Sequence, residues 1–196
     1  MMRRMALVVI DVQESFRARP LWQALDNPEL IGNVGRLVDA ARATGELVVW
    51  VLHAEYGSGG LFDPANGQVR IVDELVPAEN EPILTKTSHN AFSTTNLQQL
   101  LTQHGERTVT VCGLRTEQCV ETTARVASDF GYEVTFVTDA TGTFPIPHWS
   151  APDDQSVEDL LADPRTLSAA DVVARTQYAL AGRFATIRSV HDYIGV

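Results

Sequence analysis

Three side chains suited to covalent catalysis each come at or shortly after the end of a short apolar segment of this chain. They are Asp11, Lys86 and Cys119. Lys86 is the only lysine in the sequence, so a compact ammonium has been kept where the chain otherwise uses the rigid guanidinium of arginine. A thiol attacks a carbonyl carbon when a carboxylate accepts its proton and a cation lies nearby. These residue types therefore indicate nucleophilic acyl transfer.

The segments that precede these residues have the pattern of buried strands, and helical patterns lie between them. Continuous apolar runs predict six strands: Ala6–Ile10, Leu47–Leu52, Ile83–Thr85, Thr108–Cys112, Glu133–Thr138 and Ala185–Ser189. Apolar residues at helical spacing predict four helices: Asn33–Thr44, Thr94–His104, Gln118–Phe130 and Ala169–Ala181. Because alternating strands and helices form parallel sheets, we expect an α/β fold with three layers (α/β/α) and a mainly parallel six-stranded sheet.

The chain has the length of one compact domain, so we interpret residues 1–196 as a single domain. Residues 56–67, with four glycines, predict a loop after the second strand. Residues 142–166 are rich in proline and aspartate and predict an irregular excursion after the fifth strand. Excursions of this length are typical of a lid, a partner contact or a mobile segment.

Parallel α/β sheets bind ligands at the carboxyl ends of their strands, which places all three side chains on one edge. Cys119 would lie in the first turn of its helix, where the helix dipole and the Lys86 ammonium favour the thiolate. The free amides of that turn can receive the oxyanion of a tetrahedral intermediate. Asp11 can accept the thiol proton and later pass it to a leaving amine.

Several short motifs resemble those of the isochorismatase-like cysteine hydrolase family. They are Asp11-Val12-Gln13 after a buried strand, Lys86 ahead of Ala91-Phe92, the segment GLRTEQCV at 113–120, and TDA at 138–140. The similarity runs from about residue 5 to residue 144 and resumes weakly near residue 167. The resemblance implies the Rossmann-type topology of that family, and it implies an Asp–Lys–Cys catalytic triad.

In that triad the resemblance makes Cys119 the nucleophile, Asp11 the general base and then the general acid, and Lys86 the group that holds Asp11. The implied reaction is hydrolysis of a C–N bond in a small amide or carbamoyl compound through a thioester on Cys119. An amine or ammonia would be released. We expect no cofactor.

The resemblance also implies a non-proline cis peptide bond between Leu114 and Arg115. The backbone amides of Arg115 and Cys119 would then point at one oxygen and form the oxyanion hole. The turn itself would consist of Gly113, Leu114 and Thr116, with the Thr116 hydroxyl bracing it.

Two alternatives on the same fold stay open. An isochorismatase-type enol-ether hydrolase does not need the thiol, and a non-catalytic ligand-binding protein would leave the triad unused. The nicotinamidase branch of the family carries metal-binding Asp and His residues after the second strand. Here that stretch contains His53, and no second histidine follows before His89. We expect no metal site, because one histidine (His53) and one glutamate (Glu55) are too few ligands.

Residues close to the strand ends are expected to line the substrate pocket. The candidates follow the first three strands or belong to the turn: Gln13, Phe16, Trp22, Tyr56, His89, Asn90, Phe92 and Arg115. His53 is a further candidate for the pocket wall. Arg115 could pair with a substrate carboxylate or make a subunit contact. Amide, carbamate, ureide and enol ether all fit the same three catalytic groups, so the sequence leaves the substrate open.

The overall composition limits the classes of partner. A net charge of −10 disfavours nucleic acid and anionic membrane surfaces, so we expect a small-molecule substrate. No apolar run approaches the about 20 residues of a membrane span, and the apolar stretch near the N-terminus is too short for a signal peptide. Two cysteines cannot form a disulfide scaffold, which favours a cytoplasmic location. The family resemblance implies a homo-oligomer, either a dimer or a tetramer.

Overall fold

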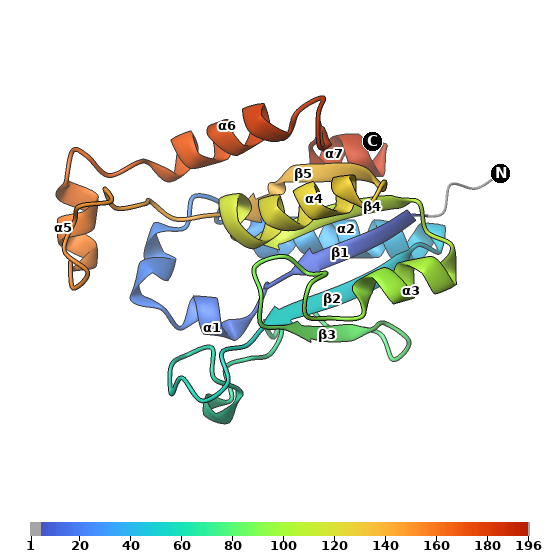
Figure 1. The fold of residues 1–196 in the computed structure, drawn as a ribbon, viewed down its shortest axis with the longest axis horizontal. Coiled ribbons are helices and arrows are strands. Elements are labelled where there is room, and N and C mark those ends of the chain that lie inside the picture. The colour runs from blue at the N-terminus through green and yellow to red at the C-terminus, as the bar shows by residue number, and fades with distance from the viewer. Residues whose placement is uncertain (1–4, 196) are drawn as a thin grey trace.

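A six-stranded sheet, parallel throughout, forms the centre of the computed structural model, which describes residues 5–195 (Figure 1). Its order is β3-β2-β1-β4-β5-β6. The strands are β1 (Met5–Ile10), β2 (Leu47–His53), β3 (Ile83–Lys86), β4 (Thr108–Leu114), β5 (Glu133–Gly142) and β6 (Thr186–Arg188). The predicted α/β class and all six strands are confirmed. Where we expected a mainly parallel sheet, every strand pair is parallel.

Helices cover both faces of this sheet. They are α1 (Glu14–Arg17), α2 (Leu30–Thr44), α3 (Leu97–His104), α4 (Glu121–Asp129), α5 (Val157–Ala162), α6 (Ala169–Leu180) and α7 (Val190–Ile194). Short helical turns occupy η1 (Pro20–Ala24), η2 (Pro64–Asn66) and η3 (Thr116–Val120). Within residues 5–195, no helix combines the length and apolar composition needed to cross a membrane.

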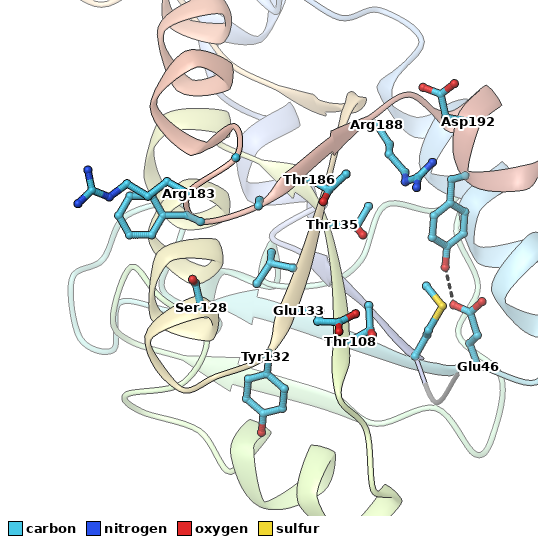
Figure 2. Close-up of a pocket in the computed structure, with 16 residues that line it drawn as sticks. Glu46, Thr108, Ser128, Tyr132, Glu133, Thr135, Arg183, Thr186, Arg188 and Asp192 are labelled. Carbon is cyan, nitrogen blue, oxygen red and sulfur yellow. Dashed lines mark hydrogen bonds between the residues drawn. The ribbon is translucent and has the colours of Figure 1, made fainter. Parts of the chain in front are cut away.

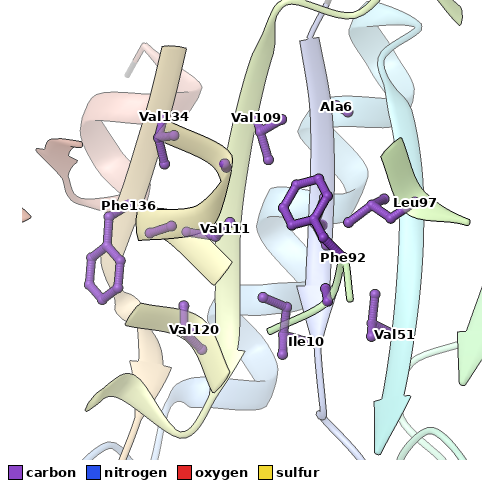
Figure 3. Packing of buried hydrophobic residues seen from close by; sticks show 14 of the residues in the cluster. Ala6, Ile10, Val51, Phe92, Leu97, Val109, Val111, Val120, Val134 and Phe136 are labelled. Atoms are coloured by element: carbon purple, nitrogen blue, oxygen red, sulfur yellow. The ribbon is translucent and has the colours of Figure 1, made fainter. Parts of the chain in front are cut away.

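Two hydrophobic clusters, one on each face of the sheet, form the core. One cluster contains apolar side chains of α3, α4 and α6, and Figure 3 shows it around β1 and β4. The other contains apolar side chains of α2 and α7. Along β1, Val8 belongs to the first cluster, whereas Leu7 and Val9 belong to the second. Burial on both faces explains why the strands are continuous apolar runs in the sequence.

The excursion between β5 and α6 differs in part from its prediction. β5 continues beyond Thr138 to Gly142, because its pairing with β4 resumes at Gly113 after a register shift. The excursion is not irregular throughout, since α5 lies within it at the far left of Figure 1. Ile146 and Leu167 pair in antiparallel fashion, which brings the two ends of the excursion together.

The predicted catalytic groups are all placed at the carboxyl edge of the sheet. Asp11 directly follows β1, and Lys86 is the last residue of β3. β4 leads through a tight turn into η3, which carries Cys119 and continues into α4. β2 lies between β1 and β3, and its last residue, His53, is paired in register with Lys86.

Candidate active site

The ammonium of Lys86 joins the predicted catalytic groups. Its Nζ lies 2.8 Å from Oδ2 of Asp11 and 3.3 Å from Sγ of Cys119. A third neighbour is Nδ1 of His53, also at 3.3 Å. The Lys86 and Asp11 side chains are fully buried, and Cys119 is nearly so. The site therefore brings a cation, a carboxyl group and a thiol into contact away from bulk solvent.

Asp11 is positioned by an unusual backbone conformation at the end of β1. Its φ of 54° lies in the left-handed region, which aspartate tolerates better than most residues. Its N–H donates to the carbonyl of Val51 at 2.8 Å. Opposite β1, Gly113 has a φ of 114°, and a Cβ there would lie 1.9 Å from the carbonyl oxygen of Ile10. Only glycine fits at this position, and it lets β4 pass close to the Asp11 strand.

Gln13 ties the segment after β1 to the end of β2. Its side-chain amide donates to the carbonyl of His53 at 3.0 Å, and its side-chain oxygen accepts from the N–H of His53 at 2.8 Å. Gln13 itself is fully buried. The residue predicted to contact substrate therefore holds the backbone of His53 beside Asp11.

Two features of the turn that carries Cys119 match what the family resemblance implied. The peptide bond between Leu114 and Arg115 is cis, as expected. The Thr116 hydroxyl donates to the hydroxyl of Thr141 at 3.0 Å, which braces the turn against β5. The amides of η3 fold back on the turn, with the N–H of Val120 donating to the carbonyl of Arg115 at 3.2 Å.

A threonine connects the Cys119 turn to the segment after Lys86. The Thr123 hydroxyl donates to the carbonyl of Cys119 at 2.6 Å and accepts from the N–H of Ala91 at 3.0 Å. Because Thr123 is fully buried, neither bond competes with solvent. The thiol and the ammonium are thus fixed to each other through backbone as well as side-chain contacts.

Burial sets the protonation of the two acidic groups. It raises the pKa of the Asp11 carboxyl group, although Lys86 opposes the rise. Burial and, after it, the Asp11 charge raise the pKa of the Cys119 thiol to about 12. The resting thiol therefore keeps its proton, which differs from the thiolate expected at a helix terminus. Desolvation outweighs the Lys86 charge in this site.

The carboxyl group of Asp11 is placed to take that proton. It interacts directly with the Cys119 thiol as well as with Lys86. Neither of its oxygens accepts a hydrogen bond of regular geometry from another group in the described chain. A buried carboxylate with few donors is a stronger base than an exposed one.

Arg115 lies between Glu117 and an aromatic ring. Its Nη2 is 3.0 Å from Oε1 of Glu117, and its Cζ lies 5.4 Å from the centre of the Phe144 ring. The Arg115 side chain is mostly buried, and its Nε contacts no acceptor in the described chain. A carboxylate partner is therefore already present beside the arginine that we expected to meet a substrate carboxylate.

The other predicted pocket residues divide into buried and exposed groups. Phe16 and Trp22 pack with the buried ring of Phe144, and Phe92 packs with Phe130 and Tyr132. Tyr56 and His89 are exposed. The Asn90 side chain accepts from the N–H groups of Phe92 and Ser93 and thereby stabilises its own turn.

His53 is the residue whose role the sequence did not predict. From the sequence, His53 was only a candidate for the wall of the substrate pocket or a single metal ligand without partners. The structure places its ring against Lys86, and its Nε2 is 3.5 Å from Oε1 of Glu55. The contact could have been predicted only from the pairing of the ends of β2 and β3. That pairing depends on the strand register, which a single sequence does not determine. Among residues 5–195, no group of three or more His, Cys, Asp or Glu side chains is arranged to hold a metal ion.

A hollow of about 640 Å³ lies at the opposite, amino-terminal edge of the sheet (Figure 2). Its lining includes Thr108 at the start of β4, Glu133 at the start of β5, and Arg188 from β6. None of the three predicted catalytic residues lines it. The hollow is therefore separate from the chemistry described above.

Comparisons with known proteins identify relatives over most of the chain. The isochorismatase domain family matches residues 5–160. An isochorismatase family protein of Bacillus subtilis, YrdC, is 31% identical over 144 residues, which is 74% of this chain and 76% of that protein. Streptothricin hydrolase of Streptomyces noursei is 34% identical over 72% of this chain and 56% of its own length. Nicotinamidase 3 of Arabidopsis thaliana is 33% identical over 71% of this chain and 73% of its own length.

The fold also matches a solved structure whose sequence identity to this chain is close to that of the relatives above. The crystal structure of an isochorismatase from Pseudomonas putida superposes with a TM-score of 0.81 at 30% identity. The match covers 96% of this chain and 89% of that one.

Proposed function

Because the isochorismatase domain matches residues 5–160, this chain belongs to the isochorismatase family of hydrolases, and we propose that it is a cysteine hydrolase acting on a C–N bond. The substrate class is a small amide or carbamoyl compound. The observation that carries this proposal is the position of Lys86, whose Nζ contacts both the Asp11 carboxyl group and the Cys119 thiol. These are the groups that a covalent acyl transfer requires.

The first half of the reaction forms a thioester. Asp11 accepts the thiol proton while Sγ of Cys119 attacks the carbonyl carbon of the substrate. The carbonyl oxygen becomes an oxyanion, which the backbone N–H groups of Arg115 and Cys119 stabilise. Asp11 then donates its proton to the substrate nitrogen, the C–N bond breaks, and the amine or ammonia leaves.

The second half uses one water molecule and restores the thiol. Asp11 accepts a proton from water as the oxygen attacks the thioester carbon. The C–S bond breaks, the acid product leaves, and the proton on Asp11 returns to Cys119. The net reaction consumes one water for each C–N bond cleaved.

The environment of Asp11 supports both of its proposed roles. Burial raises the pKa of its carboxyl group, which makes the carboxylate a better acceptor for the thiol proton. The pKa of the Cys119 thiol, at about 12, lies far above that of an ordinary carboxyl group. Proton transfer therefore needs the attack on substrate to proceed at the same time, since a free thiolate would be costly in this site.

The names of two relatives agree with amide hydrolysis, since one is called a streptothricin hydrolase and the other a nicotinamidase. We propose that substrate recognition uses the partly exposed residues at the carboxyl edge, which are Trp22, Tyr56, His89, Asn90 and Arg115. The buried residues Gln13, Phe16 and Phe92 would support that surface from behind. Assembly into a dimer or tetramer and a cytoplasmic location stay predictions.

The proposal is tested by replacing the nucleophile. Cys119→Ala should lower the rate of ammonia or amine release from a panel of small amides and ureides by at least about 10³-fold. Cys112→Ala is the matched control, because Cys112 is a buried thiol of the opposite hydrophobic cluster and should keep its activity. Intact-mass analysis during turnover should detect the acyl group on Cys119. Full activity of Cys119→Ala in this assay would refute the covalent mechanism.

A further inference from the structure

His53 ends β2 beside the catalytic ammonium, and the chain fixes it there in three ways. Its backbone is paired in register with Lys86 of β3. Gln13 hydrogen-bonds both its N–H and its carbonyl group. The ring packs edge-on against Phe62, with 5.8 Å between ring centres.

The hydrogen-bond donors of Lys86 explain why a histidine acceptor at position 53 matters. An ammonium has three donors and no acceptor. Nζ forms an ion pair with Asp11 Oδ2 at 2.8 Å and lies 3.3 Å from both Cys119 Sγ and His53 Nδ1, so these three neighbours surround its three donors. Nδ1 can accept only when the ring is neutral and its proton is on Nε2. That proton then points toward Glu55, whose Oε1 is 3.5 Å from Nε2.

We propose that His53 is a positioning residue that holds Lys86 between Asp11 and Cys119 by accepting a hydrogen bond from Nζ through Nδ1. Without that acceptor, the buried ammonium would have an unsatisfied donor and would shift within its site. Its contacts with the nucleophile and the base would change with it. The kinetic consequence rests on the proposed hydrolase function, whereas the tautomer and its coupling to Lys86 do not.

The proposal makes the site sensitive to acid. Four charged or titratable groups are near the ring: Lys86 from β3, Asp11 from β1, Glu55 after β2, and the Cys119 thiol bound to Lys86. Burial and then Lys86 lower the pKa of His53, while Asp11 and Glu55 act in the opposite direction. The ring is therefore neutral at pH 7. As pH falls through the His53 pKa, the imidazolium loses its acceptor and repels Lys86.

Two substitutions distinguish the effect of the hydrogen-bond acceptor from the effect of the imidazole ring. His53→Leu removes the acceptor, and it should lower kcat about 10- to 100-fold while KM changes less than about threefold. His53→Asn keeps an acceptor oxygen near the position of Nδ1 and should retain kcat within about fivefold. Its kcat should also fall less steeply below pH 6.5, since Asp11 alone then titrates. His191→Leu on α7, at an exposed histidine, is the matched control.

Kinetics overturn the proposal if His53→Leu keeps its kcat, or if KM rises while kcat is unchanged, since His53 would then be a substrate contact. The proposal also fails if His53→Asn is impaired as strongly as a folded His53→Leu. Circular dichroism and thermal unfolding establish that each variant is folded.

A measurement on the resting protein decides the matter without substrate. Nitrogen-15 NMR of the imidazole rings, with His53 assigned from the signal missing in His53→Asn, should show the Nε2–H tautomer and a pKa below 6.5. Lys86→Met should raise that pKa, because the ammonium lowers it. An Nδ1–H tautomer, or a His53 pKa that ignores Lys86→Met, overturns the proposal. If the unchanged protein turns over no amide, the proposed function fails. The NMR result on His53 is independent of that outcome, because it needs no substrate.

Discussion

Replacing Lys86 by methionine should destabilise the protein to a degree that depends on pH. The substitution keeps most of the buried volume and removes the cation that pairs with Asp11 in the interior. Removing one partner of a buried ion pair costs about 3–5 kcal/mol when the remaining charge is retained. Asp11 can reduce that cost by binding a proton, because burial already raises its pKa and Lys86 is the main group that lowers it.

The sign of the pH dependence follows from proton uptake. Without Lys86, the pKa of Asp11 in the folded state rises further above its unfolded value. Between those two values the folded state binds more protons than the unfolded state, so stability falls as pH rises. The slope for one such group is about 1.4 kcal/mol for each pH unit. The deficit of Lys86→Met relative to the unchanged protein should therefore be small near pH 4.5 and reach about 3–4 kcal/mol near pH 7.

Urea denaturation between pH 4.5 and pH 8 measures this difference directly. The control is the double variant Lys86→Met with Asp11→Asn, in which no carboxyl group remains at the site and the slope should disappear. A deficit that is the same at every pH would refute the reasoning, because it would mean that Asp11 is not coupled to Lys86 in the folded state. A slope that persists in the double variant would assign the titration to another group.

Two further predictions concern the turn and the thiol. Gly113→Ala should lower the free energy of unfolding by at least about 3 kcal/mol in urea denaturation, because its Cβ would lie 1.9 Å from the Ile10 carbonyl oxygen. Gly182→Ala, at a left-handed φ of 70° with open space around the Cβ, should cost only about 1–2 kcal/mol. Equal effects of the two would contradict the packing argument. Alkylation of Cys119 by iodoacetamide should accelerate about tenfold for each pH unit up to pH 9, since burial raises its pKa to about 12, while buried Cys112 stays unlabelled. A rate that levels off below pH 8 would show that the thiol is more acidic than the structure indicates.

The sequence predicted the sheet well because burial on both faces leaves a simple signature. Runs such as Leu47–Leu52 are apolar at every position, and β2 there is buried by both helical layers. The end of β5 was missed because its last residues are polar or small, and only their pairing with Gly113 and Leu114 makes them a strand. The six-residue α5 was missed because it is too short to show a helical period.

The candidate site was predictable to the extent that topology determines it. The carboxyl ends of parallel strands lie at one edge of the sheet. The topology alone therefore predicted that Asp11, Lys86 and Cys119 lie close together, without a measured distance. The contact of His53 with Lys86 depends on the register of β2 and β3, which the sequence does not state. The protonated state of the thiol depends on burial, and the helix terminus alone gave the opposite expectation.

The complete burial of Lys86 has a practical consequence for anyone who handles this protein. Since it is the only lysine of the chain and its side chain has no exposed surface, the folded molecule offers no ε-amino group to reagents in solution. Amine-directed dyes, crosslinkers and acylating agents should leave the native side chains untouched, and conjugation to a lysine would require unfolding. Incorporation of such a label at residue 86 would thus serve as a chemical report of lost native structure.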